Sequence, residues 1–484
     1  MTTSTKVGDR LSYDGELCTV RFVGTLPAWP NDVALGVEWD SPSKGKHSGS
    51  YNGVEYFKVR TPGSGSFLKQ RKQHDGTRSV YEALVYAYGT EVKIESIQIG
   101  GRKMAEIYGF EKLQKMQKVF TSLKDISLSR KCIDRLGSDE EETLTKESLQ
   151  GLHRLDLSFN LISKFDEVVK LLKGLNLEAL NLTGNQFTSH TISSDSVNLS
   201  QLNLTMTYPS EAILSSLPTH FPSLHELSLC DNGLTDLSSF VLEFPCLTSL
   251  NLSMNQFTVI PTVLSDSTIT TLNLANNDIT ITPKMTTHTF PHIVSLDLKR
   301  NNITSWYEID TLVEILPSLV ELRMSDNPIF EGWSLEEVEY QVIARWPTLT
   351  KLNGVEISPK ERENAELWFL SKVGSGDVKY SDRKTTVLKQ KYGKRAQDVH
   401  FTDPDIVELE VIDGAKMLNV KVMGSVEVLR LKSMLSRMLN RPFLKFDLTY
   451  EFGKFKEHLT NETSLVSSYG FSKGQQLTVE AKIS

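Results

Sequence analysis

The clearest pattern along the chain is a repeated alternation of apolar and polar positions of the form LxxLxLxxN. Seven clear copies run from LHRLDLSFN (152–160) to LVELRMSDN (319–327), and two weaker copies, LKDISLSRK (123–131) and LSQLNLTMT (199–207), fit the same register. Successive copies begin 22 to 29 residues apart. A unit of this size cannot bury its leucines alone, so the pattern predicts an array of short strands that stack on one another.

The alternation also assigns a direction to each side chain. Leu155 and Leu157 are expected to point into the array, and Asp156 between them to point out. The period is that of leucine-rich repeats, which form α/β solenoids. The asparagine at the end of a copy can bond backbone groups that would otherwise be buried without partners. Two copies end in Lys131 and Thr207 instead, and we expect less regular turns there.

The outward positions form two columns of short polar residues on the predicted concave face. They offer no nucleophile with a neighbouring base and no cluster of metal ligands, but they leave room for a large partner. We interpret the face as protein-binding, the usual role of such arrays; the plainer alternative is that these are solvated strand residues. The columns are Asp156, Asn181, Asn203, Ser228, Asn251, Asn273, Asp297 and Arg323, and Arg154, Ala179, Gln201, Glu226, Ser249, Thr271, Ser295 and Glu321.

The sequence after the last copy predicts a cap for the open end of the array. Such an end must hide its final leucines, and the array with its cap is expected to span residues 121–370. Residues 371–404 are polar and rich in Lys and Gly, which predicts a linker with room for a short helix. The expected core of the cap is Trp346, Leu349, Leu352 and Trp368.

Residues 405–484 change to strands around one helix. VELEV (407–411), an Asp413–Gly414 turn and MLNVKV (417–422) predict a hairpin, and FDLTYEF (446–452) and QLTVEAKI (476–483) predict two more strands. This order describes an α+β β-grasp fold, and the segment resembles ubiquitin. The chain ends in Lys482-Ile483-Ser484 rather than a glycine pair, so a built-in domain is expected. Ser425 is the expected N-cap of the helix, whose apolar face comprises Val428, Leu431, Leu435 and Met438.

Residues 1–75 alternate short β-type runs with glycine turns, which predicts a small all-β barrel. GVEWD (36–40), GKHSG (45–49), the pair Tyr56-Phe57 and GSFLK (65–69) occur in that order. They resemble the CAP-Gly domain of microtubule-associated proteins, with GKHSG in place of the more usual GKNDG. The order of CAP-Gly domain, leucine-rich repeats and ubiquitin-like domain resembles the tubulin-folding cofactor E family. Within the connecting segment, residues 76–120, the stretch 92–117 resembles that family's lead-in to its repeats.

The resemblance implies a binding site for the acidic, aromatic-ended C-terminal tail of α-tubulin. Gly45 and Gly49 would allow a tight turn that keeps side chains out of the path of the peptide. Lys46 and His47 match the positions that donate to the terminal carboxylate. A histidine beside a carboxylate can gain charge near neutrality, which predicts a pH dependence. The plainer alternatives are a solvated lysine and a neutral turn histidine.

For the aromatic end of the tail, the same matching implies an apolar slot lined by Trp29 and Phe67. Lys69 stands where the family often has a basic residue. Many CAP-Gly domains have Trp where this chain has Ala34, so a shallower slot is expected. The plainer alternative for Trp29 and Phe67 is that both belong to the core of the domain.

Composition and charge limit the remaining choices. The net charge of -7 and the 23% of charged residues are ordinary for a soluble protein and argue against nucleic-acid or membrane binding. Residues 1–75 are nevertheless locally basic, with ten Lys and Arg against eight Asp and Glu. Neither a secretion signal nor a run of about 20 apolar residues occurs, and we expect a cytoplasmic, cytoskeletal protein. No GxxxxGK[ST] or GxGxxG opens a helix, so no cofactor is expected.

The four cysteines decide between an enzyme and a binding protein. Cys18, Cys132, Cys230 and Cys246 are scattered, with no CxxC pair or Cys/His cluster at metal-ligand spacing. All lie in or beside apolar runs, and we interpret them as reduced packing residues. An enzyme of ubiquitin handling, which would need a reactive cysteine beside a histidine, is therefore the weaker hypothesis.

The sequence thus predicts a non-catalytic tubulin chaperone with a small all-β CAP-Gly barrel, an α/β leucine-rich-repeat solenoid and an α+β ubiquitin-like β-grasp domain. The resemblance implies α-tubulin as partner, work with tubulin-folding cofactors D, C and B, and assembly and dissociation of the α/β-tubulin heterodimer. The ubiquitin-like domain could recruit a further factor, with the proteasome as a candidate. The alternative is a microtubule-associated CAP-Gly adaptor, although adaptors of this kind usually carry long coiled coils and no sustained heptad pattern occurs.

Overall fold

A computed structural model of the protein describes residues 5–89, 120–187, 196–237, 244–331, 333–393, 406–414, 416–424, 426–452, 455–471 and 475–481. By its internal contacts the chain divides into two units, residues 1–303 with 314–319 and residues 304–313 with 320–484. Each is considered by itself. The expected lead-in at 92–117 and Ser425 lie outside the described residues.

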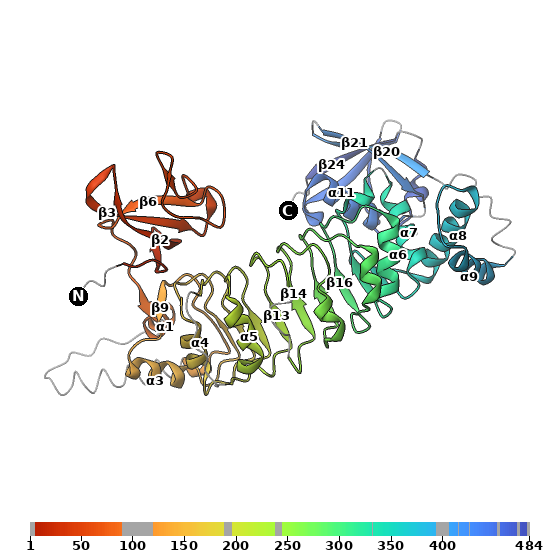
Figure 1. The fold of residues 1–484 in the computed structure, drawn as a ribbon. Helices are drawn as coiled ribbons and strands as arrows, with labels where there is room; N and C mark the ends of the chain where they lie inside the picture. Colours follow the sequence, from red (N-terminus) through yellow and green to blue (C-terminus); the bar gives the residue numbers. More distant parts are fainter. Residues whose placement is uncertain are drawn as a thin grey trace. The chain divides into compact units, whose positions relative to one another are not determined.

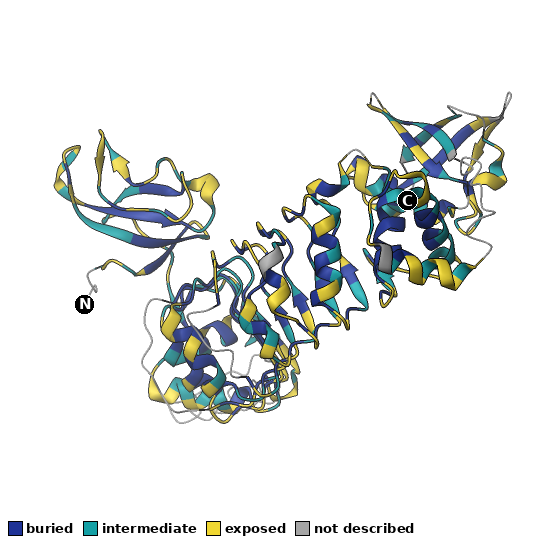
Figure 2. Cartoon of the chain, turned by 45° about the vertical axis from the view of Figure 1, so that its right-hand side comes forward, coloured by how far each residue is buried: buried dark blue, intermediate teal, exposed yellow. Residues whose placement is uncertain are grey.

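The first unit begins with an all-β domain, as predicted (Figure 1). Four antiparallel strands follow the order β1-β2-β3-β6, and β4 and β5 form a separate hairpin. The strands of this domain combine buried segments with intermediate and exposed ones (Figure 2), and the core contains Leu11, Tyr13, Cys18, Val20, Leu35, Val37 and Trp39. The elements are β1 (Arg10–Tyr13), β2 (Glu16–Leu26), β3 (Trp29–Trp39), the 3-10 turn η1 (Pro42–Lys44), β4 (Ser50–Tyr51), β5 (Val54–Glu55) and β6 (Gly65–Lys69).

The start of the connecting segment belongs to the repeat array. Strand β7 (Arg78–Ser79) pairs in parallel with β9 (Ile133–Arg135). Helix α1 (Val80–Tyr88) follows, and its N-terminus carries a capping box in which Ser79 and Glu82 satisfy each other's backbone N–H groups. The segment therefore closes the first end of the array.

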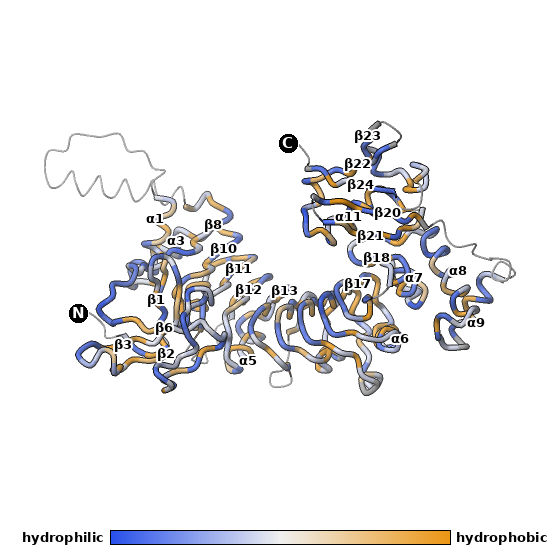
Figure 3. Tube along the Cα trace, turned by 90° about the horizontal axis from the view of Figure 1, so that it is seen from above, coloured by the Kyte–Doolittle hydropathy of each residue, from blue (hydrophilic) through white to orange (hydrophobic). Residues whose placement is uncertain are grey.

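The array of the first unit is a stack of three-residue parallel strands, and hydrophobic positions recur from one repeat to the next (Figure 3). The alternation is confirmed, because Leu155 and Leu157 are buried while Asp156 faces outward. The strands are β8 (Asp125–Ser127), β10 (Arg154–Asp156), β11 (Ala179–Asn181), β12 (Gln201–Asn203), β13 (Glu226–Ser228), β14 (Ser249–Asn251), β15 (Thr271–Asn273) and β16 (Ser295–Asp297). The returning segments include α3 (Asp139–Ser148), α4 (Phe165–Leu172), α5 (Glu211–His220), η3 (Thr262–Asp266) and η4 (Pro283–Thr287).

The terminal asparagines form the expected internal ladder. Asn160 is typical: its Nδ2 donates to the carbonyls of Leu128 (2.9 Å) and Leu157 (2.8 Å). The residue before the asparagine has a left-handed backbone in most copies. In the two copies without asparagine, the next residue, Cys132 (φ 55°) or Tyr208 (φ 47°), is left-handed as well. The prediction of less regular turns at these copies is confirmed.

The second unit starts with the end of the array and its cap. The four apolar residues predicted for the cap, from Trp346 to Trp368, are all buried. Helix α9 falls in the segment predicted as a linker, and it packs on the cap: Lys391 and the Tyr392 hydroxyl both bond Glu366. The elements are α6 (Trp306–Ile315), β17 (Glu321–Arg323), η5 (Pro328–Phe330), α7 (Leu335–Arg345), β18 (Lys351–Leu352), β19 (Val355–Glu356), α8 (Pro359–Ser375) and α9 (Asp382–Tyr392).

A β-grasp domain ends the second unit, with sheet order β21-β20-β24-β22-β23 and helix α11 against its core. Two details of the predicted helix were wrong: it begins after Glu427 rather than at Ser425, and Met438 is 45% exposed while Met434 and Leu439 are buried. Strand β23 was missed because it has only four residues. The elements are β20 (Ile406–Asp413), β21 (Lys416–Met423), α11 (Val428–Leu439), η6 (Phe443–Lys445), β22 (Phe446–Phe452), β23 (Phe455–His458), η7 (Val466–Tyr469) and β24 (Gln475–Ala481).

Candidate functional site

The glycine-rich turn 45–49 is pinned to the start of β6. The backbone N–H groups of Lys46 and His47 both donate to the carbonyl of Gly65 (2.7 and 3.1 Å), and the N–H of Gly65 donates back to the carbonyl of His47 (2.7 Å). These bonds hold the side chains of Lys46 and His47 beside β6, the strand that carries Phe67. The turn is therefore a fixed part of the domain.

Both glycines of the turn are required by close backbone packing. A Cβ on Gly45 would lie 1.9 Å from the carbonyl oxygen of Gly63, and one on Gly49 would lie 1.8 Å from that of Phe57. Gly49 also has φ +100°, a conformation that glycine adopts readily and other residues do not. The domain's own fold thus explains these glycines, and room for an incoming peptide stays a prediction.

Phe67 lies at the centre of an aromatic cluster. Its ring centroid is 4.8 Å from that of His47, and it meets four further aromatic rings edge-on. Phe67 is half-buried, so part of the cluster is open to solvent. The four rings are Phe22 (6.3 Å), Tyr51 (6.4 Å), Tyr56 (5.6 Å) and Phe57 (5.4 Å). Sequence reasoning noted the Tyr56-Phe57 pair but assigned no role to Phe22 or Tyr51, whose only signal was their aromatic character beside the motifs.

His47 is held in its neutral form. Its Nδ1 accepts a hydrogen bond from the N–H of Gly49 (3.0 Å), so the ring proton lies on Nε2. Burial, with a smaller contribution from the charge of Lys46, lowers the pKa of His47 below its usual value. The gain of charge predicted for His47 concerns a bound carboxylate and stays a prediction. His47 can still donate from Nε2 to an acceptor.

The basic residues of the domain differ in their surroundings. Lys46 is exposed and makes no ion pair among the described residues. Lys69 pairs with Asp32 (2.9 Å), and its Nζ lies 5.4 Å from the ring centre of Trp29. The hydrogen bond from Lys69 lowers the pKa of Asp32. In the described part of the chain no ring contact joins Trp29 to Phe67, so the structure groups Trp29 with Lys69 and Phe67 with His47.

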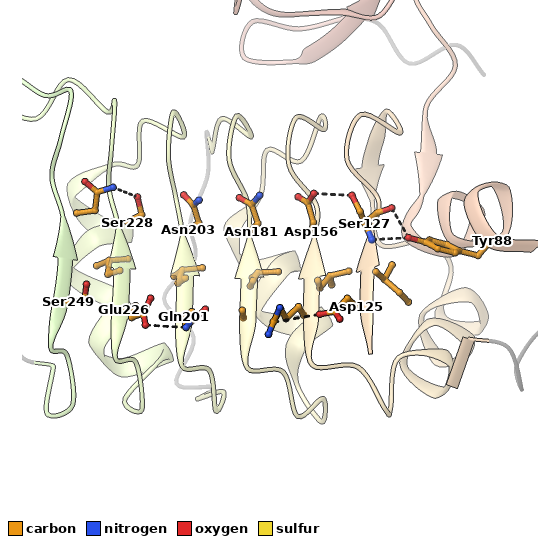
Figure 4. Close-up of a pocket in the computed structure, with 18 residues that line it drawn as sticks. Tyr88, Asp125, Ser127, Asp156, Asn181, Gln201, Asn203, Glu226, Ser228 and Ser249 are labelled. Atoms are coloured by element: carbon orange, nitrogen blue, oxygen red, sulfur yellow. Dashed lines mark hydrogen bonds and ion pairs between the residues drawn. The ribbon is translucent and has the colours of Figure 1, made fainter. Parts of the chain in front are cut away.

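A second candidate surface is a groove of about 760 Å³ on the outward face of the first repeats (Figure 4). We call it the concave groove; its lining comes from strands β8 and β10–β14 together with Tyr88. The labelled side chains from Asp156 to Ser249 stand in the two rows predicted from the sequence, and Ser127 and Asp125 of β8 extend these rows. The Tyr88 hydroxyl accepts from the N–H of Ser127 (2.9 Å) and donates to its carbonyl (3.2 Å), which closes the free edge of β8.

The asparagines of the concave groove have a fixed orientation. The Oδ1 of Asn181 accepts from the N–H of Thr183 (3.1 Å), and the Oδ1 of Asn203 accepts from the N–H of Thr205 (2.9 Å). Their amide NH₂ groups are therefore left to face the groove. The charged lining residues are Asp125, Arg154, Asp156 and Glu226. This lining can form many hydrogen bonds to a protein surface.

The cysteines and possible metal ligands are the remaining groups with candidate chemistry. The four cysteines carry no disulfide, and only Cys18 is fully buried, where burial raises the pKa of its thiol to about 12. The other three are free and partly buried, which fits their interpretation as reduced residues beside apolar runs. The described residues hold no group of His, Cys, Asp and Glu suited to a metal. Within the same residues, no helix has the length and hydropathy to cross a bilayer.

Comparison with known proteins gives matches over the front domain and over the whole chain. A sequence model of the CAP-Gly domain family matches residues 7–73. The chain is 31% identical to Protein PAC2 of Saccharomyces cerevisiae over 92% of its own length and 91% of that protein. It is 30% identical to tubulin-specific chaperone E of Danio rerio over 98% of both. The solved C-terminal ubiquitin-like domain of mouse tubulin-specific chaperone E aligns with 17% of the chain and 93% of that domain, at 22% identity and a TM-score of 0.16.

Proposed function

Because the chain belongs to the tubulin-specific chaperone E family, we propose that it is a tubulin chaperone that binds α-tubulin through two surfaces. The CAP-Gly domain takes the acidic C-terminal tail, and the concave groove takes the folded body. With tubulin-folding cofactors D, C and B, the protein assembles and dissociates the α/β heterodimer. In this proposal the ubiquitin-like domain recruits a further factor such as the proteasome.

The observation that carries the proposal is the pairing of His47 and Phe67 beside Lys46. The half-buried ring of Phe67 offers an apolar face for the aromatic end of a peptide. The Nε2–H of His47 and the exposed ammonium of Lys46 offer donors for its terminal carboxylate. In the proposed complex, this site recognises a negatively charged peptide that ends in an aromatic residue.

The concave groove supports the second contact through its size and its polar lining. Two weak contacts to one partner reinforce each other, because binding at the first site raises the effective concentration at the second. We therefore expect the whole chain to bind α-tubulin more tightly than it binds the tail peptide.

The test is titration of the full chain with a peptide of the α-tubulin tail, compared with a peptide that lacks its aromatic end. Lys46→Ala should weaken binding about twofold to fivefold, the value of an exposed charge pair. Lys58→Ala removes another exposed lysine of the same domain and should leave the affinity unchanged. Phe67→Leu keeps an apolar core contact but removes the aromatic face, and it should cause a larger loss.

The proposal is contradicted if the wild-type chain does not bind the peptide, or if Lys46→Ala and Lys58→Ala bind it with the same affinity. Sedimentation with microtubules tests the alternative of an adaptor. Stable co-sedimentation without loss of polymer would favour the adaptor over the chaperone.

A further inference from the structure

The CAP-Gly domain and the repeat array of the first unit share a network of polar contacts. Arg10 binds Asp40 through its two terminal guanidinium nitrogens, and its Nη2 also donates to the carbonyl of Gly184 in the array (3.3 Å). The Arg10 side chain is fully buried. A buried charge of this kind needs paired and hydrogen-bonded partners, and here the array supplies one of them.

Gln186 is the centre of this network. Its Nε2 donates to Asp40 (3.0 Å), and its Oε1 accepts from Thr19 Oγ1 (3.1 Å) and Arg60 Nη1 (2.8 Å). Gln186 is 8% exposed. One amide thus bonds three CAP-Gly residues that come from different parts of that domain, which specifies a single orientation better than an apolar contact would.

Tyr208 supplies the second contact, and it comes from one of the two repeats without the terminal asparagine. Thr207 stands at the asparagine position and donates to the carbonyl of Leu204 (2.7 Å). Tyr208 then adopts φ 47°, which is uncommon for a bulky residue and costs energy. In this conformation the Tyr208 ring lies 4.2 Å from the guanidinium carbon of Arg60, a cation–π distance. The irregular repeat therefore meets the CAP-Gly domain beside the regular repeat that carries Gly184 and Gln186.

We propose that Gln186 and Tyr208 are positioning residues, which dock the CAP-Gly domain on the array and so fix the tail site relative to the concave groove. The identity of the bound partner rests on the function proposed above, whereas the docking itself does not. A docked domain loses less freedom when tail and body are bound together, so the second contact forms at a higher effective concentration. Neither residue touches the tail in this proposal.

The test compares the full wild-type chain with Gln186→Ala/Tyr208→Ala, which removes both contacts. Tyr208→Phe is the matched control, because it keeps the aromatic face over Arg60. Each protein is titrated with the α-tubulin tail peptide, with α/β-tubulin whose tails have been removed by protease, and with intact α/β-tubulin. The double variant should bind intact tubulin about tenfold more weakly than the wild type does. Its affinities for the tail peptide and for tubulin without tails should equal those of the wild type. Tyr208→Phe should match the wild type throughout.

Small-angle X-ray scattering of the same proteins without tubulin gives a readout independent of function. The double variant should show a broader distribution of interatomic distances than the wild type and Tyr208→Phe. Identical scattering would overturn the docking, whatever the partner. Unchanged affinity for intact tubulin would overturn the positioning role, and loss of tail-peptide affinity would show that the residues support the CAP-Gly fold instead. If the wild-type chain does not bind the peptide, the proposed function is contradicted but the docking is not.

Discussion

The sharpest stability prediction concerns Arg430, which joins the ubiquitin-like domain to the cap within the second unit. Arg430 of α11 pairs with Glu339 of α7 and with Glu361 of α8. Glu339 is buried, and burial raises the pKa of its carboxyl even though Arg430 acts in the opposite direction. Replacing Arg430 by Met keeps the apolar stem but leaves two acidic groups without their cation.

Removing one partner of a buried ion pair costs roughly 3–5 kcal/mol. The Arg430 side chain is 28% exposed, so water screens part of the effect and we expect a value near the lower limit, about 3 kcal/mol. For a unit of this size that corresponds to a fall in the melting temperature of roughly 6–12 °C. Because burial raises the pKa of Glu339, this carboxyl can take up a proton when its cation is removed, and the loss should be larger at pH 8 than at pH 5.

Thermal unfolding followed by calorimetry at these two pH values measures the change. The matched control is Arg430→Met combined with Glu339→Gln and Glu361→Gln, which replaces the whole charged set by neutral groups and should recover most of the stability. If Arg430→Met were as stable as the wild type at pH 8, or if the triple variant did not recover, the assigned role of the ion pair would be refuted.

The remaining predictions concern three other positions. Burial raises the pKa of Glu336 to about 7 from 4.5. Its contribution to stability is therefore full below about pH 4.5 and is lost as the pH rises through about 7. In denaturant titrations, the wild type should lose roughly 3 kcal/mol of unfolding free energy over that range through this group, and Glu336→Gln should not show this loss. Gly49→Ala should destabilise the CAP-Gly domain by about 3 kcal/mol or more, measured by thermal unfolding, and abolish tail binding. Gly53 is the control, because its φ is +81° but no atom lies within 4 Å of an added Cβ. Gly53→Ala should cost about 1 kcal/mol in the same measurement. The pKa of His47 is lowered in the folded chain, so an NMR titration should place it below about 6.5, the value in the unfolded chain. The CAP-Gly domain should therefore lose stability as the pH falls through that range. His47→Asn should abolish this loss.

Several features of the candidate site could be predicted from the sequence because they depend on short segments. The turn 45–49 and the strand that carries Phe67 were correctly placed by their motifs. The grouping of aromatic side chains was not predictable in the same way. Phe22 lies in β2 and meets Phe67 of β6, although they are 45 positions apart in the sequence. The folded domain instead places Trp29 with Lys69.

The sequence by itself determined the array, because the leucine alternation and the terminal asparagine act within one repeat or between adjacent repeats. Asn160, for example, bonds carbonyls 3 and 32 residues away. Only the tertiary structure decided that the CAP-Gly domain docks on this array, since Gln186 and Asp40 meet across 146 residues. A periodic pattern records which side chain faces the core, since the backbone geometry of a strand repeats every two residues. It contains no information on which polar side chains of different domains meet, because that depends on how the whole chain folds in space.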